Sequence, residues 1–239
     1  MKGILLAGLG LVALTLAGCG GGGGGSSTSY AYPAGVWAGT TDNGKDAGVI
    51  VLPSGKIFSV YSDTGGLAGA IIGNIHMTDP SSFSFSAKDY GVDDSVDTAS
   101  VVGTFREQQD MAVTITETGG SLTASLLYQD LPPITFTDMA GTYEGDDGTV
   151  GVKTIITGGG GVTTLANDGC TTVGRLTSAG INSVFSVSLT YGTACGDYSG
   201  KGIQGIVVYD ADNSSFYAAA TNSSLTAGGI LWGQLAPPT

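Results

Sequence analysis

Three segments of the chain alternate between apolar and polar residues, which is the period of a half-buried β-strand. They are residues 82–86, 111–116 and 184–191, and in the last of them every second residue from Phe185 to Tyr191 is apolar. Turn-forming Gly, Pro, Asp and Asn interrupt the chain at short intervals, and no segment beyond residue 30 has a helical period. The sequence therefore predicts an all-β protein with about seven or eight strands in each half.

A short internal repeat divides this pattern in two. Residues 34–39 read Ala-Gly-Val-Trp-Ala-Gly, residues 140–145 read Ala-Gly-Thr-Tyr-Glu-Gly, and a polar turn follows each copy. Self-similarity on this scale favours two copies of one domain over a solenoid of short repeats. With the boundary at the Leu-Pro-Pro of residues 131–133, we predict two tandem small antiparallel β-barrels, at residues 33–130 and 131–239.

The start of the chain has the pattern of an export signal. Lys2 supplies a positive charge, and residues 4–16 form an apolar run that is too short to cross a bilayer. The run ends in Leu-Ala-Gly-Cys, which resembles the lipobox of bacterial lipoproteins. The resemblance implies a signal peptide at residues 1–18 and a fatty-acylated Cys19 as the mature N-terminus. An ordinary cleaved signal and a buried N-terminal helix are the alternatives.

The residue after the lipobox bears on the location. In enteric lipoproteins an Asp at this place retains the protein at the inner membrane, whereas here the residue is Gly20. The resemblance therefore implies an outer-membrane anchor, on either the periplasmic or the cell-surface side. Gly, Ser and one Thr fill residues 20–29, which predicts a flexible tether that, with the lipidated residue, spans residues 19–32.

This order of lipidated cysteine, glycine tether and β-domains resembles the surface lipoproteins that include transferrin-binding protein B and factor H-binding protein. Residues 216–220, followed by Gly228, Gly229 and Gly233, are similar to the closing barrel strands of that group. The resemblance implies eight-stranded barrels that bind host proteins. Separately, residues 35–37 resemble the Gly-x-Trp start of lipocalins, which implies a cavity for a small apolar ligand.

Composition limits the classes of partner. Apolar residues make up 41% of the chain, too many for a disordered protein. The net charge is −12, with 8 basic and 20 acidic residues. We therefore expect no nucleic-acid partner, because phosphate backbones are bound by clustered Lys and Arg. The acidity is explained more simply as a means of staying soluble.

Two cysteines remain once lipid occupies the first. In an oxidising compartment we expect Cys170 and Cys195 to form a disulfide. A hairpin that turns at residues 182–183 would place residues whose numbers sum to 365 opposite one another. In that register Cys170 faces Cys195, Leu176 faces Leu189, and the Cα separation of opposed residues suits a disulfide.

Candidate catalytic groups are few. His76 is the only histidine, so every His-based triad would need it, and a His-based zinc site is excluded by count. We expect it at the surface. Carboxylates cluster at Asp89, Asp93, Asp94 and Asp97, where they could act as an acid/base pair or bind calcium. A solvated loop between two strands is the interpretation we favour.

Three other features have simple structural explanations. Residues 210–214 begin like a calcium loop but lack its later ligands, so we predict a hairpin turn. Residues 196–202 contain Gly-Lys, but the remainder of a phosphate-binding loop is missing. Trp37 and Tyr143, the aromatic residues of the repeat, could floor a ligand cavity, although we favour a role in the core.

The sequence thus predicts a non-enzymatic lipoprotein, attached to the membrane by lipid, that binds a host or envelope macromolecule through its loops. We expect no metal and no cofactor. A lipocalin-like carrier of a small apolar ligand is the alternative. A hydrolase that uses the carboxylates of residues 89–97 is a third hypothesis.

Overall fold

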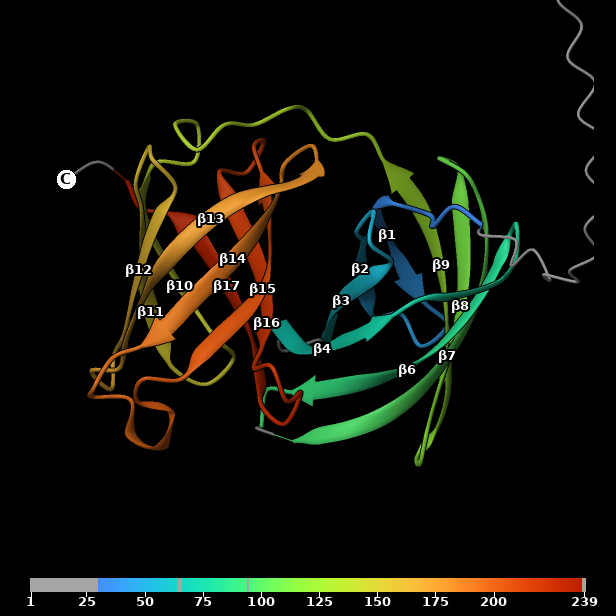
Figure 1. Cartoon of the computed structure of the whole chain (residues 1–239), viewed down its shortest axis with the longest axis horizontal. Coiled ribbons are helices and arrows are strands. Elements are labelled where there is room, and N and C mark those ends of the chain that lie inside the picture. The colour runs from blue at the N-terminus through green and yellow to red at the C-terminus, as the bar shows by residue number, and fades with distance from the viewer. Residues whose placement is uncertain (1–29, 64–65, 94, 238–239) are drawn as a thin grey trace, which may run out of the picture.

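The structure, a computed structural model, contains two closed eight-stranded antiparallel β-barrels in tandem (Figure 1). It describes residues 30–63, 66–93 and 95–237. The predicted signal peptide, the lipidated Cys19 and the Gly/Ser stretch up to residue 29 lie outside these residues. In the described part of the chain, no helix is long and apolar enough to cross a bilayer.

The first barrel contains nine strands that follow one another in chain order. It closes where β1 pairs with β9 and β4 pairs with β6. Strands β4 and β5 keep one register against β6, so they are two halves of a single strand interrupted at Ile75. The bounds are β1 Gly35–Thr41, β2 Asp46–Val51, β3 Lys56–Asp63, β4 Gly66–Asn74, β5 His76–Asp79, β6 Ser82–Gly91, β7 Val96–Arg106, β8 Asp110–Glu117 and β9 Gly120–Gln129.

The second barrel repeats this plan without the interrupted strand. Its eight strands also follow chain order, and β10 pairs with β17 to close it. A single 3₁₀ turn, Gly196–Tyr198, lies between β14 and β15. The bounds are β10 Gly141–Asp146, β11 Gly151–Ile156, β12 Gly161–Ala166, β13 Thr171–Ile181, β14 Val184–Tyr191, β15 Gly202–Asp210, β16 Ser215–Thr221 and β17 Gly228–Leu235.

The aromatic residue of the sequence repeat has the same role in both barrels. Trp37 and Tyr143 are each 1% exposed and lie on the first strand of their barrel. Trp37 Nε1 donates a hydrogen bond to the carbonyl of Pro33 at 3.1 Å, and the Tyr143 hydroxyl donates to the carbonyl of Met139 at 2.7 Å. Each bond reaches back four residues, so the aromatic side chain joins the incoming chain to the barrel core. The core role predicted for both residues is confirmed.

The last glycine of each repeat allows the barrel to close. Gly39 on β1 lies against the backbone of Ser125 on β9, and Gly145 on β10 lies against the backbone of Trp232 on β17. A Cβ at either position would overlap a carbonyl oxygen of the closing strand. The repeat therefore recurs because the first strand needs a glycine where it pairs closely with the last strand.

The strands with strict alternation bury one face in their own barrel. Phe83 and Phe85 on β6, and Met111 and Val113 on β8, are buried in the core of the first barrel, as predicted. Strands β2, β4 and β15 instead carry unbroken apolar runs. These runs are buried on both faces, because their outer side chains fill the space between the barrels.

The two barrels dock through that second layer of side chains. Strands β3 and β4 of the first barrel face β16 and β17 of the second (Figure 1). The hydroxyl of Tyr90, which is buried, lies within 2.9 Å of Thr221 Oγ1 and donates to the Leu225 carbonyl at 3.2 Å. The buried members of this interface are Val36, Ile50, Phe58, Ala70, Ile72 and Tyr90 from the first barrel and Val184, Ile206, Ala219 and Ile230 from the second.

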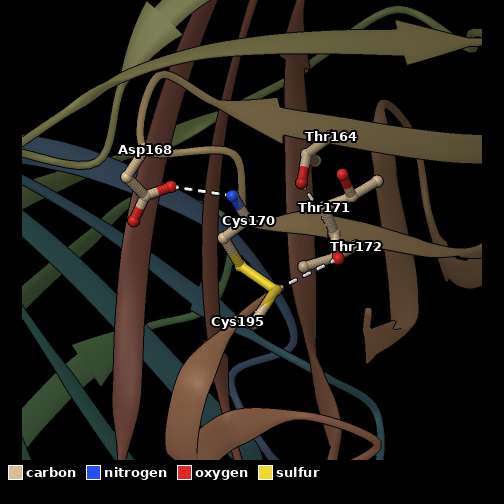
Figure 2. Close-up of a disulfide and its surroundings, with 6 residues drawn as sticks. All are labelled: Thr164, Asp168, Cys170, Thr171, Thr172 and Cys195. Atoms are coloured by element: carbon tan, nitrogen blue, oxygen red, sulfur yellow. Dashed lines mark hydrogen bonds between the residues drawn. A yellow bond between two sulfur atoms is a disulfide. The ribbon is translucent and has the colours of Figure 1, made fainter. Parts of the chain in front are cut away.

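The predicted disulfide between Cys170 and Cys195 is present, with a Cα–Cα distance of 4.5 Å (Figure 2). It does not join opposed residues of a hairpin. Cys170 lies just before β13, and Cys195 lies in the loop after β14, directly before the 3₁₀ turn. The disulfide therefore fastens this loop to the end of the barrel.

The register that we predicted for β13 and β14 is wrong. Leu176 faces Val187 instead of Leu189, a shift of two residues that persists to the far end of the pair. The cause is a bulge between Ser178 and Ile181, where Gly180 has a φ of 81°. Because a shift of two residues keeps every side chain on its face, the predicted inward positions remained correct.

Candidate functional site

The interior of the first barrel contains a cavity of about 310 Å³. Its walls are apolar over most of their length and include Val49, Ile71, Val101 and Val113. At one end it reaches the turns that connect β1 to β2 and β8 to β9, where the lining residues Asn43 and Gly119 are exposed. The cavity thus has an apolar body and one polar end that meets the solvent.

Three polar side chains from different strands converge at that end. The Tyr61 hydroxyl on β3 lies 3.0 Å from each carboxylate oxygen of Asp89 on β6. The Asp89 carboxyl also shares a hydrogen bond with the carboxyl of Glu117, the last residue of β8. We refer to Tyr61, Asp89 and Glu117 as the carboxyl pocket.

Burial changes the acidity of this pocket. Desolvation, followed by the hydrogen bond with Glu117, raises the pKa of Asp89 to about 7, although the hydrogen bond from Tyr61 acts in the opposite direction. Desolvation and the neighbouring Asp89 carboxylate raise the pKa of the Tyr61 phenol above its ordinary value. At pH values below about 7 the Asp89 carboxyl group is therefore protonated and neutral.

The carboxyl pocket has no salt bridge to a cation within the described residues. An ion pair does join Arg106 to Asp110, but it lies on the exposed surface and away from the pocket lining. Lys45 also lines this end of the cavity, and its Nζ lies 5.9 Å from the centroid of the Tyr61 ring. The half-buried Asp89 carboxyl group is thus stabilised by protonation and by the hydrogen bond from the Tyr61 hydroxyl instead of by a cation.

The second barrel has a smaller cavity of about 180 Å³ with a different polar end. The hydroxyls of Thr164 and Thr172 are 2.7 Å apart and satisfy one another, and Cys170 of the disulfide lines the same end (Figure 2). Asp147 reaches this cavity, but its carboxylate accepts hydrogen bonds from its own turn, at Thr149 and Val150. This end of the second barrel offers mainly neutral groups to a ligand.

The acidic cluster predicted as a solvated loop is divided by the structure. The prediction is wrong for Asp89, which lies within β6 and is half-buried at the cavity. Asp93 is exposed and accepts hydrogen bonds from Ser95, and Asp97 is an exposed residue of β7. Asp94 lies outside the described residues. The inward stripe of β6, which runs through Phe83 and Phe85, extends to Asp89 and explains its burial.

Other predicted positions agree with their structural interpretations. His76 is exposed at the start of β5. Residues 210–214 form a hairpin turn, in which the Asp210 carboxylate accepts hydrogen bonds from the backbone of residues 212 and 213. Residues 196–202 form the 3₁₀ turn and the start of β15. Among the described residues, no three His, Cys, Asp or Glu side chains are grouped in a way that could hold a metal ion.

Tyr61 and Glu117 were not predicted as site residues from the sequence. Both continue an inward stripe: Ile57 and Ser59 lead to Tyr61, and Met111, Val113 and Ile115 lead to Glu117. A polar residue at the end of an alternating apolar stripe was the signal that could have found them.

Comparisons of the chain with protein-family models, with curated proteins and with solved structures gave no match.

Proposed function

We propose that this protein is a non-catalytic lipoprotein of the outer membrane whose first barrel binds a small amphipathic molecule. The observation that carries the proposal is the cavity of about 310 Å³, with apolar walls and a carboxyl pocket at one end. Its volume reaches the lower limit of about 300 Å³ that is usual for small-molecule sites, whereas the cavity of the second barrel does not. This favours the carrier that we held as the alternative on sequence grounds.

The arrangement of the carboxyl groups favours binding over hydrolysis. Glycosidases separate their two carboxyl groups by roughly 5 to 9.5 Å, so that a sugar or a water molecule fits between them. Asp89 and Glu117 are in direct hydrogen-bond contact. A hydrogen-bonded pair is closer than either glycosidase geometry requires.

The disulfide supports a location outside the cytoplasm. Disulfides persist in oxidising compartments, which include the bacterial periplasm and the cell surface. The bond between Cys170 and Cys195 is therefore consistent with the export and lipidation that the lipobox implies. Mass spectrometry of the native protein should find an acylated Cys19 at its N-terminus, and a retained Lys2 would contradict this part of the proposal.

The cavity can be tested with two neighbouring residues of β7. Val101 lines the cavity and is 2% exposed, while Val102 points outward and is 51% exposed. We expect the full chain with Cys19→Ser, which carries no acyl group, to bind the neutral dye N-phenyl-1-naphthylamine with 1:1 stoichiometry. Val101→Phe should abolish this binding and Val102→Phe should preserve it.

A gentler cavity-filling variant guards against misfolding. Ala124 is buried and lines the same cavity, so Ala124→Leu should weaken dye binding while the circular dichroism spectrum stays that of the parent. Equal binding by the parent, Val101→Phe and Val102→Phe would show that the dye is held elsewhere. Absence of binding by the folded parent protein would refute the proposed function.

A protein partner is the second candidate, and one surface favours it. Ile155, Leu165 and Val173 are exposed on the outer faces of β11, β12 and β13, and they are diagonal neighbours across the sheet. Leu165→Glu should abolish capture of a host-serum or envelope protein by the immobilised chain. Leu127→Glu, at an exposed position of the first barrel, is the matched control and should preserve it.

A further inference from the structure

We propose that the ligand of the first barrel carries a protonated amine, which the carboxyl pocket binds while the apolar part of the ligand fills the cavity. The inference rests on the proposed function and specifies the chemistry of its ligand. It requires that Asp89 and Glu117 together accept the ammonium group, and that the proton on Asp89 leaves when the ligand enters.

The shape of the site sets the outline of the ligand. The apolar walls and the single polar end require a molecule with one polar group at the end of an apolar body. The cavity of about 310 Å³ corresponds to about ten water molecules at about 30 Å³ each, so the buried part has roughly ten non-hydrogen atoms. A chain or ring system of this size with a terminal amine fits these limits.

The hydrogen-bonding groups of the pocket select a donor. Ionised carboxylates only accept hydrogen bonds, and the Tyr61 hydroxyl already lies 3.0 Å from both oxygens of Asp89. An ammonium group has three donors and no acceptor, so it can satisfy both carboxylates. The face of the Tyr61 ring also attracts cations, as the position of Lys45 shows.

The charges around the pocket are mostly negative. Asp97 lies directly across from Asp89 on β7 and acts on its carboxyl group, and Asp93 acts on Tyr61 from the adjoining turn. Lys45 is the cation that lines the same end of the cavity. A ligand with a carboxylate or phosphate would be repelled by this surplus, whereas an amine would reduce it.

Binding should be linked to a proton. Below pH 7 the free pocket holds a proton on Asp89, because the pKa of this carboxyl group is raised to about 7 by burial and by Glu117. An ammonium ion requires both carboxyl groups to be ionised, so it displaces that proton. The affinity should therefore fall up to about tenfold for each pH unit below 7 and level off above it.

The test compares three ligands that differ in the head group alone. Octylamine, octanol and octanoate are titrated by calorimetry into the full chain with Cys19→Ser, between pH 5.5 and 8. We expect octylamine to bind at least about tenfold more tightly than octanol at pH 8, and octanoate to bind least. Repeating the octylamine titration in buffers of different ionisation enthalpy should show nearly one proton released at pH 5.5, about half a proton near pH 7 and almost none at pH 8.

Matched variants assign the effect to the pocket. Asp89→Asn and Glu117→Gln should each remove the preference for octylamine over octanol, and a circular dichroism spectrum equal to that of the parent shows that the variants are folded. Glu144→Gln, at an exposed position of β10, should behave as the parent. Equal affinity for octylamine and octanol in the parent would overturn the amine inference and leave the proposed function standing. Failure of all three ligands to bind would overturn both.

Discussion

The two barrels begin with the same sequence motif, but the polar residues at the ends of their cavities differ. Both open with Ala-Gly-x-aromatic-x-Gly, and in both the aromatic residue bonds back to the incoming chain. The polar end of the first cavity carries Tyr61, Asp89 and Glu117, whereas the second carries threonine hydroxyls and a disulfide. The motif therefore determines how each barrel closes. The last inward residues of a few strands determine which polar groups each cavity presents to a ligand.

If the two motifs are equivalent, their aromatic residues should contribute similar stability. Trp37→Ala and Tyr143→Ala each remove a fully buried ring, so each should lower the free energy of unfolding by about 3 to 5 kcal/mol. Denaturant unfolding followed by circular dichroism measures both. The exposed Tyr217 is a control whose replacement by Ala should cost far less. A small effect at one of the two sites would break the equivalence.

Removing the disulfide should destabilise the second barrel and leave the ligand cavity of the first barrel intact. Replacing Cys170 and Cys195 by Ser opens a loop with a sequence separation of 25. The expected loss is about 3 kcal/mol, because the unfolded chain regains the entropy of the open loop. Urea titration of the double variant and of the reduced parent gives this value. Dye binding in the first barrel should not change, and a parallel loss of dye binding would mean that the two interiors are coupled.

Much of this fold could be predicted from the alternation of side chains. Period-two segments identified strands such as β6, β8 and β14, and the repeat separated the two barrels. Inward faces were predicted correctly even where the register of β13 failed, because a bulge at Gly180 moves the pairing by two residues without exchanging faces. Bulges depend on local backbone geometry, and a two-residue shift leaves no trace in the apolar pattern.

The interface and the site were harder to predict for a physical reason. Unbroken apolar runs, such as residues 206–208 on β15, indicated burial on both faces but not the surface that covers the second face. Asp89 was assigned to a loop because it begins a carboxylate-rich segment that is broken by glycine and lies between two strands. Its contact with Tyr61 and Glu117 joins strands far apart in the chain, and only barrel closure creates that proximity.

The titration of Asp89 should give the first barrel a pH-dependent stability. The folded state holds a proton up to a pKa of about 7, whereas an unfolded Asp loses it near about 3.9. Between these values the folded state binds more protons, so the free energy of unfolding falls as the pH rises from about 4 through 7. Because the group is partly solvated, we expect a loss of about 1 to 2 kcal/mol.

Asp89→Asn isolates this effect from other titrations. The variant should be more stable than the parent at pH 8, and the difference should vanish towards pH 4, as measured by urea unfolding at each pH. Asp168→Asn in the second barrel is the control, because the Asp168 carboxylate is exposed and accepts a hydrogen bond from the backbone N–H of Cys170. Parallel stability profiles for the parent and Asp89→Asn would show that the carboxyl group of Asp89 titrates alike in the folded and unfolded states.

The smallest expected effect concerns the contact that joins the two barrels. Tyr90→Phe removes a hydroxyl that reaches Thr221 and the Leu225 carbonyl, so it should cost about 1 kcal/mol. Thr221→Val should cost a similar amount, and the double variant should cost less than the sum, because the two hydroxyls interact. Strict additivity in this cycle would mean that the hydroxyls do not interact across the interface. The hydroxyl of Tyr90 would then connect the barrels through its hydrogen bond to the Leu225 carbonyl.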